Sequence, residues 1–220
     1  MSAPEFQAAL CFRLLLPQYP SSEEIQCRNC AAVMDPYGFH SILCKEKAHF
    51  LTRHNSVRNA LFDLLYLARF NPKKDAPVTC LRIDPDTQSS TGLRPADLLI
   101  DGDDFSKECV DVCVVAPFLS ASLPNTFHVG RRAEVAQKGK YDKHLHACHA
   151  SGLGFRAFAL DAFGVPASDA ASLLDRIRDR LVRECDYGVE MATGIVYRKI
   201  SISVQRAVAQ QALNCRVHDC

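Results

Sequence analysis

The 220-residue chain is long enough for one medium-sized domain, and its 48% of hydrophobic residues suffice for a buried core. A formal net charge of +1 excludes a strong overall field toward nucleic acid or membrane, so nucleic-acid contacts would need local basic patches. No apolar run is long enough to span a bilayer, and no signal-peptide pattern is evident. The 11 scattered cysteines favour buried thiols in a reducing intracellular compartment, nuclear or cytoplasmic, over a disulfide framework.

The first 24 residues read as a helix and a linker. Residues 5–16 have an amphipathic helical pattern that ends before Pro17, and Pro17 to Glu24 is rich in proline and serine. Such a helix cannot bury its apolar face alone. We expect it to brace the following unit or to be the tail of an upstream domain.

Residues 25–48 carry the most specific local motif of the chain. Its spacing is C-x2-C-x9-H-x3-C, and it predicts a small structural zinc knuckle, because two close pairs of sulfur and nitrogen ligands suit a tetrahedral site. The ligands are Cys27, Cys30, His40 and Cys44. His49 is an alternative to His40, and the competing interpretation is two unrelated buried cysteines beside a surface histidine.

Residues 49–220 predict an α/β domain with a mixed central sheet flanked by helices. Helical periodicity covers residues 49–70, and residues 77–83 read as a strand. After a central hairpin come a polar helix over 130–151, a strand over 155–161, and helices over 168–184 and 195–212.

The hairpin, residues 94–100 and 107–115, places one aspartate in each of two apolar strands. An ionised carboxylate in such a strand is costly unless it is paired or bound to a metal. Asp97 and Asp111 therefore predict a site for Mg²⁺ or Mn²⁺, since hard cations often take one or two carboxylates. Alternatively, each aspartate caps a turn or pairs with an arginine.

The polar helix supplies candidate cations. Lys138 shares a face with Tyr141 at helical spacing and is the preferred lysine for orienting a water, with Lys140 second. Basic residues of the same helix would grip phosphates without reading sequence, namely Arg131, Arg132 and Lys143. The competing interpretation is a solvated charged face.

Together these features resemble the PD-(D/E)xK nucleases. Arg94-Pro95-Ala96-Asp97, then Val110-Asp111-Val112-Cys113, match the acidic part of that motif, and Gln137-x-x-x-Tyr141 matches a helix found in some branches. The order of knuckle, Arg53-His54-Asn55 helix, two aspartate strands and lysine-tyrosine helix is similar to the restriction-like endonuclease after the reverse transcriptase of non-LTR retrotransposons.

The resemblance implies a restriction-endonuclease-like fold and metal-dependent nicking of target DNA that exposes a 3′ hydroxyl. It assigns Asp97 and Asp111 to a catalytic Mg²⁺ or Mn²⁺, and Lys138 or Lys140 with Tyr141 to catalysis. Arg94 and Gln137 join the basic residues as candidate substrate contacts. The partner is then DNA, with RNA as an alternative, and the chain would be part of a larger reverse-transcriptase polyprotein.

One departure from the family pattern separates two hypotheses. Cys113 stands where the usual lysine follows the second acid, so catalysis requires that a helix lysine replaces it. The alternative is a catalytically inactive nucleic-acid-binding module on the same fold, and a third interpretation is a zinc-stabilised interaction domain. A nucleophilic role for Cys113 has little support, because a thiol among strand valines is usually inert.

Overall fold

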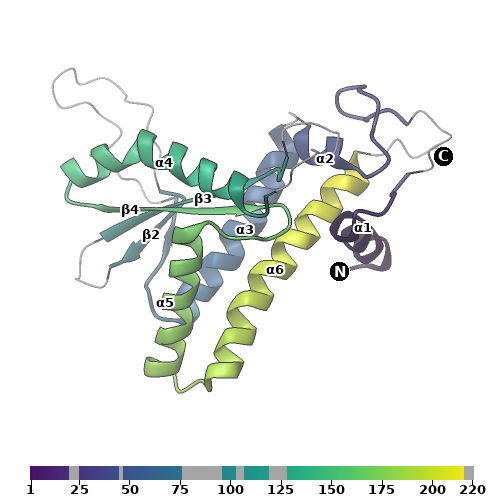
Figure 1. The fold of residues 1–220 in the computed structure, drawn as a ribbon. Helices are drawn as coiled ribbons and strands as arrows, with labels where there is room; N and C mark the ends of the chain where they lie inside the picture. The colour runs from purple at the N-terminus through teal and green to yellow at the C-terminus, as the bar shows by residue number, and fades with distance from the viewer. Residues whose placement is uncertain (20–24, 45–46, 76–95, 103–106, 119–127, 216–220) are drawn as a thin grey trace.

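A computed structural model describes residues 1–19, 25–44, 47–75, 96–102, 107–118 and 128–215 of the chain. In this part the protein is a mixed α/β structure with a sheet of four strands flanked by helices (Figure 1). None of the described helices combines the length and apolar character needed to cross a membrane.

The sheet has the strand order β1-β2-β3-β4. Strand β2 (Leu98–Asp101) pairs antiparallel with β1 (Lys73–Lys74) and with β3 (Lys107–Val115), and β4 (Gly154–Asp161) pairs parallel to β3. A parallel pair needs a long crossover, and helix α4 provides it. The expected hairpin is therefore present as β2 and β3, whereas the expected strand over residues 77–83 lies outside the described residues.

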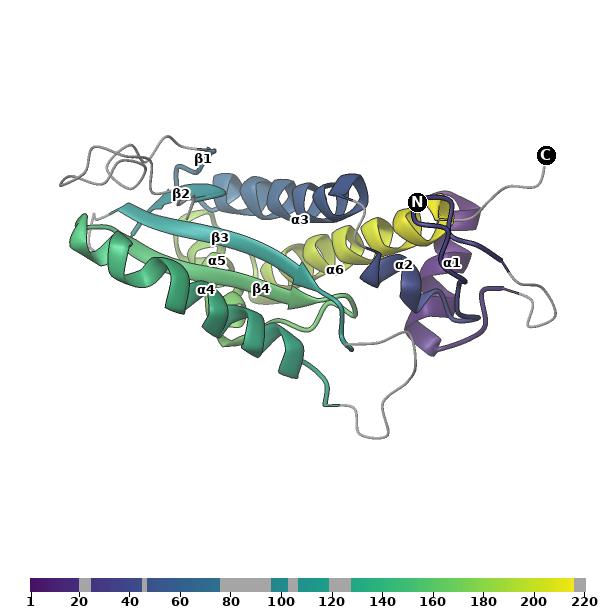
Figure 2. The same ribbon diagram turned by 90° about the horizontal axis from the view of Figure 1, so that it is seen from above.

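Helices cover the two faces of the sheet unequally. Helix α4 (Arg131–Ala150) lies along one face, and helices α3 (Lys47–Leu67) and α5 (Ser168–Glu184) pack on the other (Figures 1 and 2). Helix α6 (Val189–Asn214) packs behind α3 and α5 as a further layer. Since β3 is buried on both faces, its residues can be apolar almost throughout.

The pleat of β3 sorts its residues between these layers. Val110, Val112 and Val114 belong to the main hydrophobic core with α3, α5 and α6. Cys109 and Cys113 belong to smaller buried clusters with residues of α4. Side chains alternate along a strand, so Asp111 also points to the α4 side of the sheet.

The N-terminal elements pack onto the rest of the protein. Helix α1 (Ala3–Leu14) starts with a capping box between Ser2 and Glu5 and packs on α6. The short helix α2 (Phe39–Leu43) also contacts α6. Because Phe12 of α1 and Phe39 of α2 are buried in the main core, the three predicted segments share one core.

Most helices lie close to the ranges expected from the sequence. The last helix differs most, because it begins at Val189 and contains Gly194, a residue type that sequence reading favours at helix boundaries. Tertiary packing explains this, since Ala192 and Val196 on either side of the glycine are fully buried. The packed face stabilises the helix more than the glycine weakens it.

Candidate active site and metal centre

Asp111 occupies the middle of β3, opposite Ala157 of β4, and its side chain is only 5% exposed. The Lys140 ammonium, on the facing side of α4, lies 2.9 Å from each of the two Asp111 carboxylate oxygens. Burial raises the pKa of Asp111 to about 6, although Lys140 acts in the opposite direction. The ion pair thus only partly offsets the cost of the buried charge.

Asp97 immediately precedes β2 and joins the same site. Its backbone N–H donates to the Val110 carbonyl, and its Oδ2 accepts a hydrogen bond of 2.8 Å from the Val112 N–H. The charge of Asp97 contributes to the raised pKa of Asp111, so the two carboxylates interact. The structure therefore brings together the two aspartates predicted from the sequence.

Two histidines complete the surroundings of the carboxylates. His54 of α3 lies with Nε2 2.9 Å from Asp97 Oδ2, and His144 of α4 lies with Nε2 3.5 Å from Asp111 Oδ2. Burial raises the pKa of Asp97, but His54, the Val112 N–H and Lys140 together outweigh it, and the net pKa is lowered. Burial and the neighbouring lysines lower the pKa of His144 to about 4, so that ring is neutral.

Sequence reasoning gave neither histidine a role at the carboxylates. His144 had a signal, since it lies four residues after Lys140 and therefore shares its helix face. His54 had none beyond its place in the Arg53-His54-Asn55 stretch, because its contact with Asp97 joins residues that are far apart in the chain.

The order of preference between the two lysines is reversed by the geometry. Lys138 is exposed, whereas Lys140 is the lysine that contacts Asp111. Tyr141, which lies three residues after Lys138, contacts α5 and not the carboxylates. The Tyr141 hydroxyl donates to Asp169 of α5.

Gln137 and Tyr141 therefore hold the start of α5. Gln137 accepts from the Asp169 N–H at 3.0 Å and donates to the Ser168 hydroxyl at 2.9 Å, while Glu134 accepts from the Ser168 N–H at 2.7 Å. These bonds provide acceptors for backbone N–H groups that have no partner within the helix at its first turn. In the structure Tyr141, predicted to act in catalysis, and Gln137, predicted to contact substrate, thus bind the start of α5.

The other predicted substrate contacts lie on α4 or outside the described residues. Arg131 and Lys143 are exposed and Arg132 is half-buried, so the first two are available to a ligand. Arg94 lies outside the described residues.

Cys113 does not take the place of the missing lysine. It is 6% exposed, and burial raises the pKa of its thiol to about 11. A neutral, enclosed thiol supplies no charge for catalysis and is a poor nucleophile.

The second site is the cluster of Cys27, Cys30, His40 and Cys44, whose ligand atoms all lie within 4.8 Å of one another. The Cys44 sulfur lies 3.9 Å from that of Cys27 and 3.8 Å from that of Cys30. Two sulfurs bound tetrahedrally at about 2.3 Å from zinc are about 3.8 Å apart. The predicted ligand set thus forms a cluster that could bind a metal such as zinc, and the side chain of His49 is outside the described part.

The local fold prepares these ligands. Asp35 accepts hydrogen bonds from the backbone N–H groups of Tyr37, Phe39 and His40, and it thereby caps the helix that carries His40. Burial raises the pKa of Cys27, but the N–H groups of Asn29 and Cys30, together with the side chains of His40 and Cys30, outweigh it and lower the pKa to about 6. A thiolate at neutral pH is the form that binds zinc.

A buried arginine links the cluster to the carboxylate site. Arg53, which is 4% exposed, donates to the Ile42 carbonyl of α2 and, at 2.9 Å, to Gln211 Oε1 of α6. Gln211 in turn donates to the Ser41 carbonyl at 2.6 Å. His54 follows Arg53 on α3. Arg53 therefore contacts α2, the helix that carries the ligand His40, and the next residue contacts the Asp97 carboxylate.

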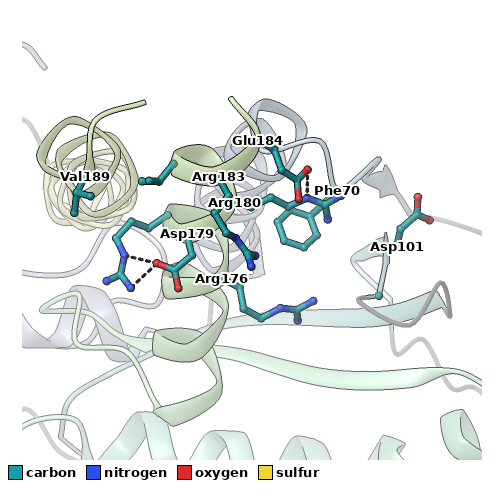
Figure 3. A pocket seen from close by; sticks show the side chains of 11 residues that line it. Phe70, Asp101, Arg176, Asp179, Arg180, Arg183, Glu184 and Val189 are labelled. Carbon is teal, nitrogen blue, oxygen red and sulfur yellow. Dashed lines mark hydrogen bonds and ion pairs between the residues drawn. The ribbon is translucent and has the colours of Figure 1, made fainter. Parts of the chain in front are cut away.

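A pocket also lies away from the carboxylates. A cavity of about 820 Å³ is lined by Phe70, by Asp101 and by arginines of α5 (Figure 3). It lies on the α5 side of the sheet, opposite the carboxylates. Most of its charges are paired inside the protein, since Arg176 binds Glu108, Arg178 binds Asp179 and Arg180 binds Glu184. The cavity therefore lacks the converging reactive groups that the carboxylate site has.

No protein-family model matches the chain, and no curated protein matches its sequence.

Proposed function

We propose that this protein is a metal-dependent DNA endonuclease of the PD-(D/E)xK type, similar to the restriction-like endonuclease of non-LTR retrotransposons. One observation carries the proposal, namely that Asp97 and Asp111 approach each other on one side of the sheet with Lys140 bound to Asp111. In such a site the migrated lysine is Lys140. The mixed sheet flanked by helices supports the restriction-endonuclease-like fold that the resemblance implies.

The side chains of Asp97 and Asp111 are suitable ligands for a divalent cation. Carboxylates are ligands that Mg²⁺ and Mn²⁺ prefer, and burial, to which the charge of Asp97 adds, raises the pKa of Asp111 although Lys140 acts in the opposite direction. Asp97 and Asp111 would hold the ion. When bound, the ion polarises a phosphoryl oxygen and lowers the pKa of an attacking water.

Lys140 has the chemistry to act on the substrate. Its ammonium, 32% exposed on a long side chain, can turn from Asp111 toward the scissile phosphate and offset the charge that develops there. The water oxygen forms a bond to phosphorus as the bond from phosphorus to the 3′ oxygen breaks. The leaving oxygen takes up a proton, and the products are a 3′ hydroxyl and a 5′ phosphate.

Contacts with the DNA backbone are assigned to α4. The exposed Arg131 and Lys143 lie on the helix that carries Lys140, so a strand that reaches Lys140 would pass along a basic surface. Such contacts position a nucleic acid without reading its sequence. Because the whole chain is nearly neutral, DNA would be attracted by the basic residues of this helix and not by the overall charge of the protein.

In the same proposal the Cys27, Cys30, His40 and Cys44 cluster holds a structural zinc ion. The four ligands leave no position for a reacting molecule, and closed sites of this kind stabilise folding. All nine cysteines among the described residues are free thiols, consistent with an intracellular, reducing location.

The second candidate function is a nucleic-acid-binding module without catalysis. It is favoured by Cys113 in the usual lysine position and by the engagement of Lys140 with both Asp111 oxygens. In that case α4 still binds the backbone, but no cleavage follows.

Nicking of supercoiled plasmid with Mg²⁺ or Mn²⁺ separates the two candidates. The proposed nuclease nicks the plasmid, and Asp111→Ala abolishes the activity. Asp142→Ala, which removes an exposed acid of the same α4 helix, leaves the activity unchanged. DNA binding without nicking by the wild type would instead establish the binding module.

A further inference from the structure

The Asp97 carboxylate is held by two donors that meet at one of its oxygens. Oδ2 accepts a hydrogen bond of 2.8 Å from the Val112 backbone and lies 2.9 Å from His54 Nε2. The Val112 bond comes from strand β3. The His54 contact comes from helix α3, which packs on the face of the sheet opposite α4. Because both donors hold Oδ2, they restrain the orientation of the carboxylate, and Oδ1 is free of these two bonds.

His54 is itself held in place. Its Nδ1 lies 3.3 Å from Asn55 Oδ1, and its ring stacks near Phe50 with centroids 6.4 Å apart. The preceding residue, Arg53, is buried and anchored to α2 and α6. A histidine with one nitrogen on a carboxylate and the other on a hydrogen-bonding partner has a fixed ring orientation, as partners of metal ligands often do.

A purely structural ion pair is a weaker explanation of this arrangement. The His54 side chain is 15% exposed and that of Asp97 is 22% exposed, so the pair is largely buried, and the cost of desolvating both groups offsets much of the stability that their attraction contributes. The His54–Asp97 pair lies next to Asp111, and this position suits it to a role in cation binding. The orientation of Asp97 decides whether its free oxygen meets the same cation as Asp111.

We propose that His54 is a positioning residue of the nuclease site, which aims the Asp97 carboxylate at the cation that Asp97 and Asp111 share. This role rests on the proposed function. It predicts that loss of His54 weakens cation binding more than it slows the reaction at saturating cation.

The test is titration of the zinc-loaded full-length protein with Mn²⁺, followed by electron paramagnetic resonance of the free ion. Asp111→Ala identifies the signal of the carboxylate site. We expect His54→Ala to weaken Mn²⁺ binding about 10- to 100-fold, the usual effect of losing a partner of a metal ligand. The Mn²⁺ concentration for half-maximal nicking should rise by a similar factor.

Two further variants make this test specific. His54→Gln keeps an N–H donor near Asp97 and should recover part of the Mn²⁺ affinity. His149→Ala removes an exposed histidine at the end of α4 and should bind Mn²⁺ as the wild type does. Circular dichroism and thermal melting establish that each variant is folded.

The outcomes distinguish this inference from the proposal on which it rests. If the wild type binds Mn²⁺ through Asp111 and nicks DNA, but His54→Ala has unchanged Mn²⁺ affinity, the positioning role is overturned and the nuclease stands. If the wild type shows no Asp111-dependent Mn²⁺ binding, the nuclease site itself is overturned.

Discussion

At the scale of residues, the sequence predicted the two carboxylates, but it favoured Lys138 over Lys140, the lysine that contacts Asp111. Asp97 and Asp111 could be found because a charged residue in an apolar strand requires an explanation. The choice between Lys138 and Lys140 depends on how α4 is rotated about its axis. The helix has few apolar residues, so its buried side is marked only by small or unusual residues such as Ala133 and Cys148. Lys140 lies on that side and Lys138 does not.

The lysine position offers a direct exchange experiment. Cys113 follows Asp111 by two residues on the same side of β3, and it is close enough to influence the pKa of Lys140. In the double variant Lys140→Ala with Cys113→Lys, an ammonium returns to the strand position usual for the family. We expect this variant to nick plasmid DNA faster than Lys140→Ala alone.

The reason is that a lysine at position 113 of β3 restores the positive charge near Asp111 that Lys140→Ala removes. The single variant Cys113→Lys is the control and should be less stable than the wild type in thermal melting, since it crowds two ammonium groups together. Equal nicking by the double variant and Lys140→Ala would show that the strand position cannot replace the helix lysine.

At the scale of elements, the periodicity of the sequence was sufficient for most helices and for the central hairpin. It could not give the contacts between elements. The sequence predicted a substrate contact for Gln137 and a catalytic role for Tyr141, but both side chains form hydrogen bonds with the start of α5. The beginning of α6 was missed because Gly194 lies within that helix, where burial of its neighbours overrides propensity.

Tyr141→Phe tests the role assigned to this contact. The substitution removes the hydrogen bond to Asp169 and keeps the ring against Phe155. We expect the free energy of unfolding to fall by about 1 kcal/mol, as for loss of one partly exposed hydrogen bond. The nicking rate should stay within about twofold of the wild type, because the hydroxyl does not reach the carboxylates.

Tyr66→Phe is the matched control, since Tyr66 is 71% exposed, and it should melt like the wild type. If Tyr141→Phe lost nicking activity while it kept wild-type stability, Tyr141 would be a catalytic residue after all.

At the scale of the whole molecule, the cysteine cluster is tied into the fold from several sides. Cys215 at the end of α6 is buried next to Cys27 and Cys44, and its carbonyl accepts from the Arg28 N–H at 3.0 Å. The Cys-His spacing predicted the cluster itself. Its attachment to α6 could not be predicted, because nothing in local spacing shows that residues near 215 return to residues near 28.

Removal of zinc is therefore expected to affect the whole domain. Since a structural zinc ion couples binding to folding, a zinc chelator should lower the melting temperature, and Cys27→Ser should lower both the zinc content and the melting temperature. Cys11→Ser, which changes a partly exposed thiol outside the cluster, should retain one zinc per chain by metal analysis. An unchanged melting temperature after complete zinc removal would show that the module does not support the core.

The most direct test of the central claim compares Lys140→Ala with Lys138→Ala in the plasmid-nicking reaction. The two lysines are two residues apart on α4 and carry the same charge, but only Lys140 contacts Asp111. We predict that Lys140→Ala slows nicking by about 10²- to 10³-fold, as loss of a group that stabilises developing charge does, while Lys138→Ala remains close to the wild type. Equal activity of the two variants, or a selective loss in Lys138→Ala, would contradict the assignment of this site.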